Sequence, residues 1–171
     1  MTAKVFLEQF MPYHDRIYRL SLRLLGNQAD AADLVQDVYV KLWNMRHQMI
    51  HYNNTEAFAM TMTKNLCYDR LRSSERRTIS LNPQQVIVEN ISPDKILEYS
   101  ETHQSIEEFI SRLPEVQQLV MHLRDIENYE FEHIAEVTGL NLNHIRVSLS
   151  RARKSVREQL VYKSNYGNTK N

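Results

Sequence analysis

Apolar residues recur at helical spacing along most of the chain, and no run alternates cleanly with a period of two. The spacing predicts a first long helix that ends at Gly26, and a second helix over residues 30–45. A third helix, capped by Asn54 or Thr55, is predicted to continue to residue 77. The chain is therefore predicted to be all-α.

Each predicted helix has an apolar stripe that we expect to be buried. The stripes are Phe6, Phe10, Tyr13, Ile17, Leu20 and Leu24 in the first helix, Ala31, Leu34, Val38, Leu42 and Met45 in the second, and Phe58, Met62, Leu66 and Leu71 in the third. Later come Ile106, Phe109, Ile110 and Leu113, and then Val116, Leu119, Val120 and Leu123 behind Pro114, which we expect at the first position of its helix.

Residues 130–160 have the pattern of a helix-turn-helix. A short apolar helix begins near Phe131, and Gly139 suits the left-handed conformation that ends many helices. Asn141 can cap the next helix, in which Leu142, Ile145, Leu149, Ala152, Val156 and Leu160 share one face.

The opposite face of that last helix is polar and basic. Between Arg146 and Arg157 there are five basic residues and no acidic one. The outward positions carry Asn143, His144, Val147, Ser150, Arg151 and Lys154, with Arg146 beside them. Such groups read base edges and hold phosphates, so this face favours DNA binding over an ordinary helical hairpin.

The helix over residues 30–45 has an acidic outer face. Asp33, Gln36, Asp37 and Val40 lie opposite its apolar stripe, with Asp30 at the edge. Carboxylates also suit the start of a helix because they complement its dipole. An exposed valine beside acids and an amide nevertheless favours a protein-docking face over a merely solvated one.

The helix that ends at residue 77 becomes basic toward its end, where aromatic and amide residues interleave with arginine and lysine. Basic residues in a last turn also complement the helix dipole. Aromatic and amide groups beside a basic stripe are typical of surfaces that bind unstacked bases. The sequence alone only suggests single-stranded nucleic acid here.

The remaining segments set the organisation of the chain. Residues 78–104 are acidic and proline-punctuated, which predicts a flexible linker, and residues 163–171 are predicted to be a disordered tail. The loop over residues 46–54 contains His47 and His51, but a metal site there is not expected because no further ligand is near.

Composition excludes several classes of protein. The chain has 171 residues and zero formal net charge, although its charges are unevenly distributed. Its single cysteine, Cys67, excludes an internal disulfide framework and fits a cytoplasmic protein. The sequence shows no membrane-spanning run and no signal-peptide layout. It also shows no catalytic constellation, so we expect no enzyme, cofactor or metal.

Three stretches together resemble the sigma-70 family of transcription initiation factors, and most of all its small two-domain extracytoplasmic-function group. They are DAADLVQDVYVKLW (30–43), FAMTMTKNLCYDRLRSSERR (58–77) and LPEVQQLVMHLRDIENYEFEHIAEVTGLNLNHIRVSLSRARK (113–154). The resemblance implies a region 2 domain over residues 1–77, the linker 78–104, and a region 4 domain over residues 105–162. It also implies core RNA polymerase, promoter DNA and an anti-sigma factor as partners.

The resemblance further implies a role for each surface. Docking on the coiled coil of the polymerase β′ subunit would fall to Asp30, Asp33, Gln36, Asp37 and Val40. Recognition and melting of the −10 element would fall to Lys64, Asn65, Tyr68, Arg70, Arg72, Arg76 and Arg77. Reading of the −35 element would fall to Asn143, His144, Arg146, Val147, Ser150, Arg151 and Lys154.

The sequence departs from the family pattern at two positions. Ser148 stands where many members have a basic residue, which leaves the −35 preference open, and Asn128 stands where many have glycine. Two other readings of the sequence remain. One is a stand-alone helix-turn-helix regulator whose first domain senses a ligand or dimerises, and the other is a helical adaptor that binds only proteins.

Overall fold

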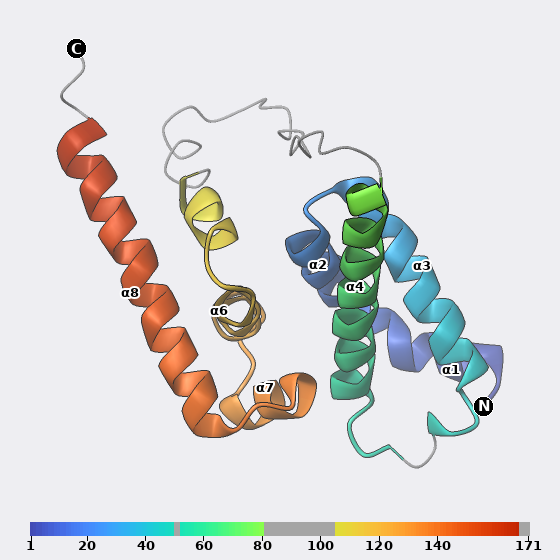
Figure 1. Cartoon of the computed structure of the whole chain (residues 1–171). Coiled ribbons are helices and arrows are strands. Elements are labelled where there is room, and N and C mark those ends of the chain that lie inside the picture. The colour runs from blue at the N-terminus through green and yellow to red at the C-terminus, as the bar shows by residue number, and fades with distance from the viewer. Residues whose placement is uncertain (50–51, 81–104, 168–171) are drawn as a thin grey trace, which may run out of the picture. The chain divides into compact units, whose positions relative to one another are not determined.

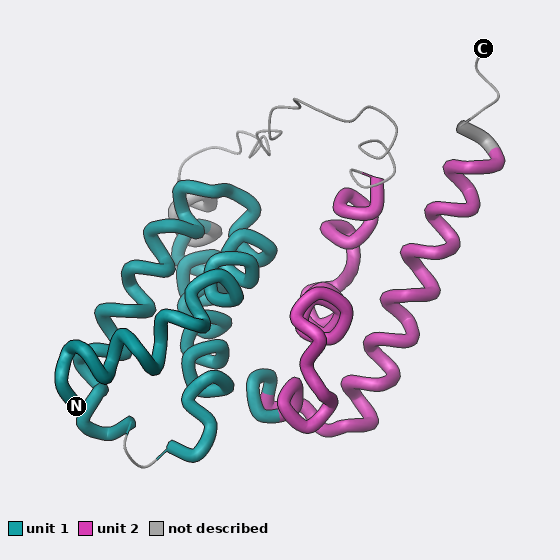
Figure 2. Tube along the Cα trace, turned by 180° about the vertical axis from the view of Figure 1, so that it is seen from behind, with its two compact units in different colours: residues 1–90, 136–138 teal, residues 91–135, 139–171 magenta. Residues whose placement is uncertain are grey.

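The structure is a computed structural model that describes residues 1–49, 52–80 and 105–167, except for the side chains of residues 75–80 and 166–167. The described residues contain no β-strand, so the all-α prediction is confirmed. They form two compact units, shown in separate colours in Figure 2. Most of the predicted linker lies outside the described residues.

In its described residues the first unit contains α-helices and a short 3₁₀ turn (Figure 1). They are α1 (Ala3–Phe10), η1 (Met11–Tyr13), α2 (His14–Leu25), α3 (Gln28–Asn44) and α4 (Thr55–Ser80). The prediction of one long first helix was wrong, because Pro12 lies in η1, between α1 and α2. Proline has no backbone N–H to donate and its ring clashes with the preceding turn, so it interrupts a continuous α-helix.

Capping residues fix where α3 and α4 begin. Gly26 ends α2 in the left-handed conformation, with φ of 77°, as predicted. Asn27 then accepts a hydrogen bond from the backbone N–H of Asp30 at 2.7 Å. The side chain of Asn54 accepts one from the N–H of Ala57 at 2.9 Å, so of the two predicted caps of α4 it is Asn54 that acts.

The predicted apolar stripes of α1, α2 and α3 supply most of the core of the first unit. Phe10, Ile17, Leu20, Leu34 and Leu42 are at most 1% exposed. The predicted stripe residues at the ends of the helices, Tyr13, Leu24 and Met45, are only half-buried. α2 packs against both α3 and α4, and α3 and α4 also contact each other.

The predicted buried face of α4 was wrong. Phe58, Met62, Leu66 and Leu71 are half-buried, whereas the fully buried positions are Ala59, Met60, Thr63 and Cys67. α4 contacts both α2 and α3, and small side chains allow such close packing while larger ones stay at its margins. The Thr63 hydroxyl is satisfied inside the core, because it donates to the carbonyl of Ala59 at 2.8 Å.

The second unit begins with a helix over residues 105–111. It continues with α6 (Glu115–Met121), the π-helical turn η3 (His122–Ile126), α7 (Phe131–Thr138) and α8 (Leu142–Gly167), except that residues 136–138 of α7 are grouped with the first unit in Figure 2. One hydrophobic cluster of this unit combines residues from the helix over residues 105–111 with residues of α8. Its buried members are Phe109, Ile110, Leu113, Ala152 and Val156. The predicted helix-turn-helix corresponds to α7, Gly139 with φ of 75°, and α8.

Four predictions for the second unit and its borders need correction. Val116 is 36% exposed rather than part of the core, and Pro114 precedes α6 as its N-cap instead of starting it. Residues 78–80, assigned to the linker, are the helical end of α4. Residues 163–167, assigned to a disordered tail, continue α8, because polar composition does not by itself stop a helix that is already nucleated.

The turn between α6 and α7 contains the position at which glycine was expected. The N–H of Glu127 donates to the carbonyl of His122 at 3.1 Å, which closes a wide π turn. Asn128 follows with φ of 57°, the one positive value at a non-glycine position in the described residues. Asparagine tolerates this left-handed conformation better than most residues, so the departure from glycine keeps the backbone geometry.

Candidate functional site

The acidic face of α3 has the arrangement that the sequence predicted. Asp33, Gln36 and Asp37 are exposed, and Val40 is 59% exposed. Asp30, also exposed, lies in the first turn of the helix behind the Asn27 cap. Since the inward residues Leu34 and Val38 hold α3 on the core, these five outer side chains contribute little to packing. We call them the docking face.

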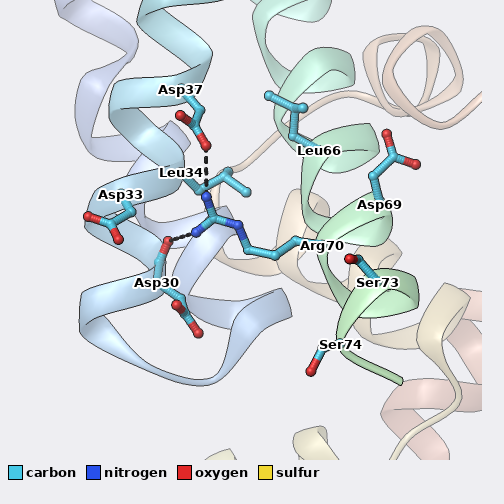
Figure 3. A pocket seen from close by; sticks show the side chains of 9 residues that line it. All are labelled: Asp30, Asp33, Leu34, Asp37, Leu66, Asp69, Arg70, Ser73 and Ser74. Atoms are coloured by element: carbon cyan, nitrogen blue, oxygen red, sulfur yellow. Dashed lines mark hydrogen bonds and ion pairs between the residues drawn. The ribbon is translucent and has the colours of Figure 1, made fainter. Parts of the chain in front are cut away.

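The docking face borders an open cleft between α3 and α4 (Figure 3). The cleft has a volume of about 560 Å³ and is lined by Asp30, Asp33, Leu34, Asp37, Leu66, Asp69, Arg70, Ser73 and Ser74. Arg70 donates to the Asp37 carboxylate at 2.7 Å and to the backbone carbonyl of Asp30 at 3.0 Å. One residue predicted to contact the −10 element is therefore bonded to the docking face, a contact that the sequence did not reveal.

The other residues predicted to read the −10 element all lie on α4. Asn65 and Arg72 are exposed, and Lys64 and Tyr68 are half-buried. Arg76 and Arg77 belong to the last turns of the helix, and their side chains lie outside the described part of the structure. Asn65 is therefore accessible, as a base contact requires, and its amide is one of the groups that can bond to base edges.

The outer face of α8 presents every residue predicted to read the −35 element. Asn143, His144, Arg146, Val147, Ser150, Arg151 and Lys154 are all exposed. Asn141 caps the helix by accepting from the N–H of His144 at 2.8 Å. The core side of the same helix holds Ile145 and Leu149, which are at most 4% exposed. We call the seven outward residues the recognition face.

Two residues of α8 lie outside the recognition face: Arg153 is exposed but paired, and Ser148 is buried. Arg153 forms a two-pronged ion pair with Asp125 of η3, with its Nε 3.1 Å from one carboxylate oxygen. This bond raises the pKa of Arg153 and ties α8 to η3. Ser148 is only 6% exposed, so in this chain it does not face outward and is not available to read DNA.

Inside the first unit the thiol of Cys67 is fully buried. Burial, the dominant effect, raises its pKa to about 12, despite a side-chain hydrogen bond with Ser21 and the nearby charge of Arg70, which lower it. The thiol therefore stays protonated and unreactive near neutral pH. Among the described residues, no group of three or more histidine, cysteine, aspartate or glutamate side chains is placed to bind a metal ion.

Two family models match the chain in order and cover most of it. Sigma-70 region 2 matches residues 10–77, and sigma-70 region 4 matches residues 103–156. The chain belongs to the sigma-70 family. The match places α3 and α4 in region 2 and the helix-turn-helix in region 4.

Relatives within the sigma-70 family include members of its extracytoplasmic-function (ECF) group. The chain is 29% identical to the ECF RNA polymerase sigma factor SigE of Mycolicibacterium smegmatis, over 86% of this chain and 58% of SigE. It is 28% identical to the RNA polymerase sigma factor SigV of Bacillus subtilis, over 94% of each protein. The chain thus spans little more than half the length of SigE but almost all of SigV.

A solved structure has a similar fold. The sigma factor RpoE from Bartonella quintana, crystallised with the anti-sigma factor NepR, matches with a TM-score of 0.76 over 92% of this chain and 98% of RpoE. The two sequences are 22% identical, so this likeness concerns the fold. No described helix of the chain combines the length and apolar character needed to cross a membrane.

Proposed function

We propose that this sigma-70 family member is an ECF sigma factor that binds core RNA polymerase and directs it to a subset of promoters. The observation that carries the proposal is that one chain has two exposed surfaces of opposite charge. The docking face on α3 is acidic, and the recognition face on α8 is basic and amide-rich. The family models match the two surfaces in the order region 2, then region 4.

In this proposal the docking face binds the coiled coil of the polymerase β′ subunit. Asp33 supplies an exposed charge, and Val40 supplies exposed apolar area of the kind that interfaces bury. Because neither side chain belongs to the core, the surface is free to bind a partner without unfolding the unit. Charges of this kind mainly raise the association rate and select the partner.

Promoter DNA would contact the other two surfaces. The recognition face would enter the major groove at the −35 element, where arginine and asparagine side chains distinguish bases by paired hydrogen bonds. The exposed side of α4 would contact the −10 element, with Asn65 recognising an unstacked base and Tyr68 and the basic residues Lys64, Arg72, Arg76 and Arg77 holding the strand. Both assignments are to be tested by substitution.

The experiment that tests the function is reconstitution. Core polymerase with and without the chain is incubated with genomic DNA, and the 5′ ends of the transcripts are sequenced. The proposal predicts start sites that appear only when the chain is present and that share −35 and −10 sequences. The same set of start sites in both reactions would overturn it.

Binding of the chain to duplex DNA without core polymerase separates the alternatives. A stand-alone helix-turn-helix regulator would bind a specific duplex without core polymerase, and a protein adaptor would bind no DNA. Neither is favoured by the two family matches. We further propose that the chain is not an enzyme, that it acts in the cytoplasm, and that an anti-sigma factor restrains it, as NepR binds RpoE.

A further inference from the structure

The guanidinium group of Arg70 reaches from α4 across the cleft to α3. One nitrogen donates to Oδ2 of Asp37 at 2.7 Å, and another donates to the backbone carbonyl of Asp30 at 3.0 Å. Figure 3 shows the side chain extended toward both acceptors, which belong to residues about two turns apart on α3. Arg70 is thus bonded to a side chain and to the backbone of the docking face.

The surroundings of Arg70 are unfavourable for a nucleic acid. The cleft carries the carboxylates of Asp30, Asp33, Asp37 and Asp69, which repel phosphate. The Arg70 side chain is 32% exposed, whereas that of Asp37 is 58% exposed, so the guanidinium is the more covered partner. Two of the five N–H donors of Arg70 are already bonded to α3, so fewer remain for a DNA contact. Arg72, two residues later on α4, is exposed.

The same contacts favour a role in presenting Asp37. A carboxylate has about four acceptor sites, and Arg70 occupies only one oxygen, so the other oxygen remains available to a partner. Holding the side chain in one orientation before binding reduces the conformational entropy lost on association. The second bond, to the Asp30 carbonyl, fixes the guanidinium itself, since a planar fork with two acceptors has little freedom.

We propose that Arg70 is a positioning residue for polymerase docking, which orients Asp37 on the docking face, and that it does not contact the −10 element. This inference rests on the proposed function, because it concerns how the docking face of a sigma factor is held. It reassigns a residue that the family resemblance had placed with the DNA-binding arginines. The expected consequence is that Arg70 affects polymerase affinity through Asp37.

The test compares Arg70→Ala with its matched control Arg72→Ala, which removes the same charge from the same helix. Two quantities are measured for each variant: the affinity for core polymerase, and promoter opening by permanganate footprinting at saturating core. Arg70→Ala should weaken core binding about fivefold, which corresponds to about 1 kcal/mol, and leave opening unchanged. Arg72→Ala should leave core binding unchanged.

A double-variant cycle shows whether Arg70 acts through Asp37. In an Asp37→Ala background, which has no acceptor for Arg70, the further change Arg70→Ala should have little additional effect on core affinity. Arg70→Lys, which keeps the charge but has no fork, should recover part of the lost affinity. Thermal unfolding of each variant is the control for folding, and if Arg70→Ala unfolds, Arg70→Lys with the Asp37→Ala cycle replaces it.

The outcomes are distinguishable. Unchanged or tighter core binding by Arg70→Ala, with wild-type binding intact, would overturn this inference and leave the proposed function standing. A loss of opening at saturating core would return Arg70 to the DNA-binding set. A wild-type chain that fails to bind core polymerase would overturn both proposals.

Discussion

Asn128 offers a direct test of the backbone geometry ahead of the helix-turn-helix. Its φ is 57° and its side chain is exposed, so substitution changes the backbone preference while removing little packing. A left-handed conformation costs an ordinary L-residue about 1–2 kcal/mol, a cost that asparagine reduces and glycine avoids. Asn128→Ala should therefore lower the stability of the second unit by about 1 kcal/mol.

Asn128→Gly separates strain from the loss of the side chain. Glycine relieves the strained φ but adds freedom to the unfolded chain, so its stability should stay within about 0.5 kcal/mol of the wild type. For a unit of this size, 1 kcal/mol corresponds to a shift of about 4–8 °C in Tm. The glycine and alanine variants should therefore differ measurably, with glycine the more stable.

Thermal unfolding followed by circular dichroism at 222 nm measures the effect. The chain's single tryptophan, Trp43, lies in α3, so its fluorescence reports on the first unit and serves as an internal reference. A matched control is Asn143→Ala, because Asn143 is an exposed asparagine within a regular helix and alanine has the higher helix propensity. An alanine variant at position 128 as stable as the glycine variant would refute the left-handed turn.

Four further predictions follow from the exposed and buried side chains. Asp33→Arg should abolish or strongly weaken core binding in a pull-down. Because Asp33 is exposed, the change should alter the free energy of unfolding by no more than about 0.5 kcal/mol. Retained binding would remove Asp33 from the docking face. Arg151→Ala should weaken promoter complexes by roughly 1–3 kcal/mol if it pairs with a base, measured by gel shift at one fixed salt concentration. Asn65→Ala should spare −35 binding and slow opening of the −10 region, so an unchanged permanganate footprint would exclude it. Cys67 should resist iodoacetamide at pH 8 until the protein unfolds, because burial raises its pKa to about 12. Since the thiol of the unfolded chain ionises near its ordinary pKa of 9.0, the free energy of unfolding should fall as pH rises from about 9 toward 12.

Features set by local sequence were predicted well. Gly139 takes the left-handed conformation that glycine allows at a helix end, and Asn141 caps α8 through its side-chain oxygen. The two faces of α3 were also separated correctly, because Leu34 and Val38 mark the inner side while Asp33 and Asp37 mark the outer side. When only one face of a helix is buried, the periodicity of the helix's own sequence is enough to predict which face that is.

Features that depend on the packing of distant residues were missed. α4 is covered by two helices, and its innermost positions hold the small residues Ala59, Thr63 and Cys67 beside Met60, whereas the predicted large apolar residues lie at its margins. The bond between Arg70 and Asp37 joins residues 33 positions apart, a separation with no helical period. Exposed arginine and aspartate residues alone do not indicate which of them will pair.

The π turn at His122–Ile126 contains one residue more than an α-helical turn would. An extra residue of this kind lets a helix accommodate an insertion without rotating the residues that follow by about 100° around the helix axis. Asp125 lies on this turn and holds Arg153 of α8. Removing one residue here would restore a regular α-helix and rotate Asp125 away from α8, so any shortening of this segment must be matched by a new partner for Arg153.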